Sequence, residues 1–173
     1  MSHACIRYTL MATTFLFCVA TSDVANCQTR KETEEFLVKK IAGARTQYNT
    51  GIGVIKTRWD INFKNDKVTI TQTSEDSNPS IIKTDVFDIK DIDPDLIELS
   101  QLNDGSYQID LMVHDSRSLV EHNIYRKGEK VPKPLDTYHA QLFNISNEKR
   151  TANQLLKSFK HLATLAQPKE LFD

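Results

Sequence analysis

The feature that most restricts the fold is a long amphipathic segment near the end of the chain, residues 147–166. Its apolar residues recur every three or four positions, which predicts one helix with a single apolar stripe. Such a stripe needs another element to cover it. Ser146 or Asn147 is expected to cap this helix, and Pro168 to end it. The stripe consists of Ala152, Leu155, Leu156, Phe159, Leu162, Ala163 and Ala166.

The middle of the chain has the period of two that marks strands with one buried face. In residues 55–63, for example, Trp59 and Phe63 share a face with Ile61, while charged and amide side chains alternate with them. Turn signals separate the runs, the strongest being Asn103-Asp104-Gly105. Strands are expected at residues 55–63, 68–72, 81–89, 96–102, 107–113, 119–126 and 138–145.

A further helix is expected before the strands, over residues 29–44, because apolar side chains again recur at helical spacing. Thr29 followed by Glu32 predicts a capping box at its start. Two helices around about seven short strands predict an α+β fold with a largely antiparallel sheet. We expect the sheet to be bent or to form a partly open barrel, with the final helix lying over its opening.

This order of elements, ending in NEKRTANQLLKSFKHLATLA, resembles the pleckstrin-homology-like (PH-like) architecture. The phrase FDIKDIDPDLIELS followed by that helix is similar to uncharacterised secreted bacterial proteins of this type. The resemblance implies a helix that plugs one end of a bent sheet pair, with Phe159 and Leu162 facing inward. It implies no activity.

The first 22 residues predict a signal peptide. Arg7 precedes an apolar run of eleven residues, 10–20, and small or polar residues follow it. A helix needs about 20 apolar residues to cross a bilayer, so no transmembrane span is expected after processing. We expect cleavage at residues 20–25, a flexible linker at 23–28 and a single domain at 29–173. The protein would then be secreted, to the periplasm, the cell envelope or the outside.

The cysteines bear on anchoring and on stability. Val24-Ala25-Asn26-Cys27 resembles a lipoprotein box, in which Cys27 would be lipidated. Simple secretion with a free Cys27 is the favoured alternative, because Asn26 is larger than that box usually accepts. Cys5 and Cys18 would leave with the signal peptide, and one cysteine cannot form an internal disulfide. The fold is therefore expected to hold without one.

Charge and composition narrow the classes of function. The chain has 22 basic and 23 acidic residues, a balance that does not favour a nucleic-acid partner. A hydrophobic content of 39% and a charged content of 26% are typical of a globular domain rather than of a disordered chain. The sequence has no glycine-rich phosphate loop, so neither nucleotide chemistry nor a cofactor is expected.

Two groups of side chains are candidates for a metal ion. In the acidic run 88–98, a calcium loop starting at Asp91 would place leucines where glycine and a bidentate glutamate are needed. We expect instead a solvated turn bent by Asp93 and Pro94. His114 and His122 lie on consecutive expected strands and would face each other across a hairpin. Their spacing is not that of a helical zinc pair, and no metal site is predicted.

Three functions remain open. The first is a non-enzymatic binding or assembly module of the cell envelope, acting through an edge strand or the open end of its sheet on an unknown protein or small molecule. The second is a carrier of a small apolar ligand. The third is an unrecognised hydrolase using His114 and Asp115, although neighbouring residues on a strand point to opposite faces. The carrier's cavity would be lined by Trp59, Phe63, Leu111 and Phe159.

Overall fold

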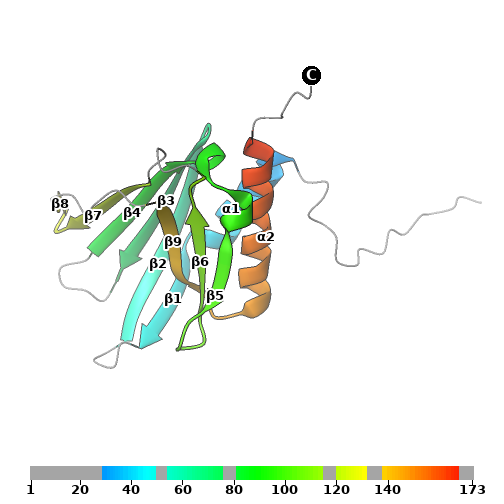
Figure 1. Cartoon of the computed structure of the whole chain (residues 1–173). Coiled ribbons are helices and arrows are strands. Elements are labelled where there is room, and N and C mark those ends of the chain that lie inside the picture. The colour runs from blue at the N-terminus through cyan, green and yellow to red at the C-terminus, as the bar shows by residue number, and fades with distance from the viewer. Residues whose placement is uncertain (1–28, 50–53, 76–80, 115–119, 132–137, 168–173) are drawn as a thin grey trace, which may run out of the picture.

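The computed structural model describes residues 29–49, 54–75, 81–114, 120–131 and 138–167. In these ranges two helices flank nine strands and two short 3-10 helices (Figure 1). The elements in chain order are α1 (Arg30–Ile41), β1 (Ala44–Asn49), β2 (Val54–Lys64), β3 (Lys67–Ser74), β4 (Ile81–Asp88), η2 (Ile89–Asp91), η3 (Pro94–Leu96), β5 (Glu98–Gln101), β6 (Tyr107–Met112), β7 (Glu121–Arg126), β8 (Glu129–Lys130), β9 (His139–Ser146) and α2 (Lys149–Ala166).

The strands form two antiparallel sheets. The larger has the order β1-β2-β3-β4-β7-β8, and the smaller has the order β5-β6-β9. β1 lies beside β9 without forming a ladder with it, so the two sheets adjoin at these strands. The described strands close no barrel. The expected α+β class, with a largely antiparallel sheet and a helix at each end, is confirmed.

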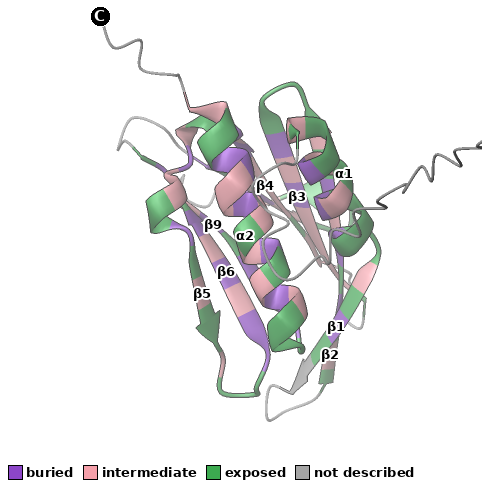
Figure 2. Cartoon of the chain, turned by 90° about the vertical axis from the view of Figure 1, so that its right-hand side faces the viewer, coloured by how far each residue is buried: buried purple, intermediate pink, exposed green. Residues whose placement is uncertain are grey.

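The two helices lie side by side on one face of the sheets (Figure 2). α1 contacts α2 and β2, whereas α2 also contacts β5, β6 and β9. Phe159 and Leu162 are fully buried, as the sequence predicts. Their partners include Trp59 of β2 and Leu111 of β6, which belong to the same core cluster. The final helix therefore covers a sheet and completes one hydrophobic core.

α1 begins as expected and ends early. Thr29 and Glu32 form the predicted capping box, and the backbone N–H of Thr29 donates to Glu32 Oε2 at 2.8 Å. These hydrogen bonds from Thr29 lower the pKa of Glu32, the backbone bond being the larger cause. The helix ends at Ile41 rather than residue 44, because Gly43 adopts a φ of +73° that turns the chain into β1.

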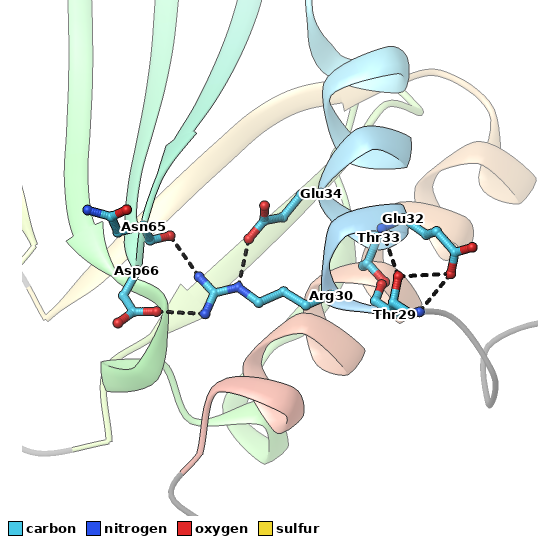
Figure 3. A network of polar contacts seen from close by, with 7 residues as sticks. All are labelled: Thr29, Arg30, Glu32, Thr33, Glu34, Asn65 and Asp66. Carbon is cyan, nitrogen blue, oxygen red and sulfur yellow. Dashed lines mark hydrogen bonds and ion pairs between the residues drawn. The ribbon is translucent and has the colours of Figure 1, made fainter.

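Arg30 ties the start of α1 to the turn between β2 and β3 (Figure 3). Its guanidinium donates to Asp66 Oδ1 at 2.6 Å, to the backbone oxygen of Asn65 at 2.7 Å and to Glu34 Oε1 at 2.8 Å. The bonds to Glu34, and then to Asp66, raise the pKa of Arg30. A planar guanidinium suits this role because it offers several donors in a fixed geometry.

The turn from β5 to β6 follows its sequence signal. Gly105 has a φ of +84°, which other residues rarely adopt. Asp104 accepts hydrogen bonds from the Ser106 hydroxyl at 2.6 Å and from the Ser106 backbone N–H at 3.0 Å. These bonds, the hydroxyl first, lower the pKa of Asp104. The Ser106 hydroxyl also contacts the side chain of Asn144 in β9, so the turn is joined to the neighbouring strand.

The structure has more strands than the about seven expected from alternation. β1 was missed for two reasons. Ala44, its apolar inward residue, was assigned to the preceding helix, and the next inward residue, Thr46, is polar. β8 has only two residues. At the start of α2, Glu148 is the cap residue rather than Ser146 or Asn147, although the Ser146 hydroxyl accepts from the Glu148 backbone N–H at 3.0 Å. Pro168 lies outside the described residues.

Replacing Phe159 with alanine tests the helix-over-sheet core. We expect F159A to lower the free energy of unfolding by about 3–5 kcal/mol, because it leaves a cavity in a fully buried site. Urea denaturation measures this loss. Leu165→Ala is the control on the same helix, since Leu165 is 45% exposed, and it should cost less than about 1 kcal/mol. Equal effects of the two substitutions would contradict the packing described here.

The Arg30 network predicts a smaller effect. R30A should lower the free energy of unfolding by about 1 kcal/mol, because the bonds to Asp66 and Asn65 are charge-assisted but partly exposed. The control is Lys31→Ala, whose ammonium lies 3.9 Å from Glu35 with both side chains well exposed, and which should change stability by less than about 0.5 kcal/mol. Matched urea denaturation curves separate the two; a larger loss in K31A would refute this role of Arg30.

Candidate binding site

The core face of the larger sheet changes character between β3 and β4. A cross-strand row runs from Ile61 through Ile70 and Asp85 to His122. Directly opposed residues project from the same face of a sheet. Since Ile61 and Ile70 are buried in the core, Asp85 and His122 continue the core face. The hydrophobic row therefore ends in an ionisable pair.

Asp85 and His122 are in direct contact. The Nδ1 atom of His122 bonds Asp85 Oδ1, and the side chains are 24% exposed for His122 and 12% for Asp85. The pair joins β4 to β7 at the border between core and solvent. With Nδ1 engaged by the carboxylate, Nε2 remains as the second polar atom of the imidazole ring.

The two rows beyond this pair combine apolar and cationic side chains. Lys83 lies opposite Ile124, and Ile81 lies opposite Arg126. Lys83 and Arg126 are exposed, whereas the isoleucines are half-buried. Figure 1 shows β4, β7 and β8 on the side of the molecule away from α2. We call this surface the β4–β7 patch, formed by Ile81, Lys83, Asp85, His122, Ile124 and Arg126.

Such a surface is suited to binding. Apolar side chains supply contact area, and cations at its margin supply charge complementarity and orientation. On β4 the patch follows directly from the buried Phe87, and on β7 it follows Val120, the buried residue just before that strand. The same face is thus packed at one end and solvent-accessible at the other.

His114 and His122 are not neighbours, so the expected hairpin between them is wrong. β6 pairs with β5 and β9, while β7 pairs with β4 and β8. β6 belongs to the smaller sheet and β7 to the larger one, so the two strands do not form a hairpin. His114 instead pairs with Asp93 through Nδ1 and Oδ2, 3.1 Å apart. Among the described residues, no three histidine, cysteine or carboxylate side chains are grouped to hold a metal.

Asp93 has a structural role in the acidic run. Its carboxylate accepts from the Asp95 backbone N–H at 2.9 Å and caps η3, which fits the expected turn at Asp93 and Pro94. The bond to His114, and then that to Asp95, lowers the pKa of Asp93. A lowered pKa stabilises the fold above the unfolded-state pKa, and this contribution is lost as the pH falls through the folded-state value.

The residues predicted to line a carrier's cavity come together in the core. Trp59, Leu111 and Phe159 are buried, and Phe63 packs against the same cluster half-buried. They belong to β2, β6 and α2 and share one core cluster, which is the ordinary role of core residues. The carrier stays a prediction. Asp115 and Cys27 lie outside the described residues, so the hydrolase and lipidation hypotheses also stay predictions.

Sequence reasoning missed the pairing of Asp85 with His122. The sequence held one indication of it. Asp85 and Phe87 are two residues apart on one strand, so they share a face, and the carboxylate therefore lies on the buried face of that strand. His122 is likewise in step with the buried Val120. The sequence could not show that His122 is the partner of Asp85, because β4 and β7 pair although they are far apart along the chain.

Comparison with protein-family models, curated proteins and solved structures finds no match to this chain. The site is therefore interpreted from its own chemistry. Neither described helix combines the length and the apolar character needed to cross a membrane.

The two histidine–aspartate pairs allow a matched test. H122A should lower the free energy of unfolding by about 1–2 kcal/mol, because it leaves the largely buried Asp85 without its partner. H114A should cost less than about 0.5 kcal/mol, because its side chain is 70% exposed. Urea denaturation at pH 7 compares them, and a loss in H114A as large as that in H122A would show that burial does not set the difference.

Proposed function

We propose that this protein is an exported, non-enzymatic binding or assembly module and that the β4–β7 patch is its binding surface. One observation carries the proposal: the core face of the larger sheet extends past the helices and presents Lys83 and Arg126 beside half-buried Ile81 and Ile124. Apolar surface that stays accessible to solvent and is bordered by polar residues marks a site where another molecule binds.

The chemistry of the patch favours a protein partner with acidic and apolar side chains. Lys83 and Arg126 would pair with its carboxylates, while Ile81 and Ile124 would contact its apolar residues. The face is a better candidate than the adjacent edge, because β8 offers only Glu129–Lys130 for pairing with another strand. Short edge strands with a lysine discourage edge pairing.

The non-enzymatic part rests on the surroundings of the histidine–aspartate pair. Among the described residues, the nearest positions on the same face are Ile70, Phe87 and Lys83 around Asp85, and Val120 and Ile124 around His122. None of them is a serine or cysteine nucleophile. Without a nucleophile beside it, the pair would serve to join two strands, and Asp85 would hold the imidazole of His122 in position for a bound partner.

The cellular part of the proposal rests on the signal peptide at residues 1–22. Processing at residues 20–25 would release the domain outside the cytoplasm, and lipidation of Cys27 would hold it at a membrane surface. Native mass spectrometry of protein exported by its own host distinguishes these forms by mass. Retention of an apolar molecule in that experiment would favour the carrier instead.

The proposed relationship to the PH-like architecture is supported by the antiparallel strands and by a C-terminal helix that packs its stripe against them. α1, the helix expected before the strands, packs against α2 on the same side of the sheets (Figure 2). The resemblance concerns architecture and carries no ligand with it.

Photocrosslinking tests the binding surface. A photoreactive amino acid at position 124 faces the patch, whereas one at position 125 projects from the opposite face of the same strand. In the host, the variant at 124 should give a crosslinked product of discrete mass, and the variant at 125 should not. K83E should weaken that product at least tenfold through charge reversal. Equal crosslinking at both positions, or none, would contradict the proposal.

A further inference from the structure

Three buried polar atoms on the inner face of β1 and β2 have no hydrogen-bond partner among the described residues. They are Thr46 Oγ1, Thr57 Oγ1 and Trp59 Nε1. Thr57 is fully buried, Trp59 is 1% exposed and Thr46 is 9% exposed. Buried polar side chains in native proteins nearly always have a partner, either in the protein or in an ordered water.

The strand register brings the three side chains together. Thr46 lies directly opposite Thr57, and Trp59 lies opposite Ala44. Thr57 and Trp59 are two residues apart on β2, so they project from one face, and Thr46 is the diagonal neighbour of Trp59. Directly opposed and diagonal side chains on one face have Cβ atoms roughly 5–8 Å apart. An indole N–H and two hydroxyls at these positions can reach a common point.

We propose that these three residues form a site for one internal water molecule. A buried water typically makes about three hydrogen bonds. The indole N–H of Trp59 is a donor only, so it would donate to the water oxygen. The water's two protons would then be donated to Thr46 Oγ1 and Thr57 Oγ1, which accept.

The residue types favour a wet site over a dry one. Valine has nearly the shape of threonine. If no water were present at positions 46 and 57, valine would fill them as well as threonine does and would avoid the cost of burying two hydroxyls without hydrogen bonds. A direct bond between the threonines would still leave the indole N–H without an acceptor. A single water satisfies all three groups.

The site is independent of the proposed function. It lies on β1 and β2, whereas the β4–β7 patch lies on the other side of β3 in the same sheet. A failure of either proposal therefore leaves the other unaffected.

Oxygen-17 magnetic relaxation dispersion of the full chain counts long-lived internal waters and tests the site directly. The double variant T46V/T57V should lose one such water relative to the unmodified protein. Trp59 is the only tryptophan, so its fluorescence reports on the same place. Its emission should shift to shorter wavelength in the variant, because the indole loses a hydrogen-bonded water.

The matched control is T71V/T84V. Thr71 and Thr84 are also a directly opposed threonine pair, but they project from the other face of the sheet. This variant should keep both the water count and the emission. An unchanged water count in T46V/T57V, or a loss as large in the control, would overturn the proposal.

Should T46V/T57V fail to fold, T46S/T57S keeps both hydroxyls and should keep the water. The unmodified chain also decides the question by itself: the absence of any long-lived water from its dispersion would overturn the proposal. A retained organic molecule at these hydroxyls, seen in an electron-density map, would overturn it as well.

Discussion

The structure depends on covering the apolar stripe of α2. A large apolar side chain contributes about 1.5–3 kcal/mol when it is fully removed from water, and Leu155, Phe159 and Leu162 are all removed from it. No described element other than the smaller sheet, its flanking 3-10 helices and α1 packs closely against this helix. The position of α2 then determines which parts of the sheets are packed and which remain open.

The open part follows from unequal coverage. α1 and α2 pack chiefly on β2 and on the smaller sheet, so in the described part of the chain β4 and β7 extend the core face with neither helix packed closely on them. A carboxylate and an imidazole at this border, Asp85 and His122, limit the exposure of apolar surface and fasten the two strands. A polar pair there is compatible with folding because each group satisfies the other.

Much of the architecture could be predicted because it is encoded locally. The capping box at Thr29 and the turn at Gly105 depend on contacts within a few residues, and both are confirmed. β1 was missed because one inward residue, Ala44, was assigned to the helix before it and another, Thr46, is polar. The same property makes Thr46 informative in three dimensions, where it meets another threonine across the ladder.

The sequence by itself determined the class of fold, since periods of two and of about 3.6 residues specify strands and helices and show which face each must bury. Only the tertiary structure decided which strands pair. It separated His114 from His122, placed each beside an aspartate and brought β4 next to β7. Pairing across distant segments depends on how the sheets pack around the helices, and no short stretch of sequence contains that information.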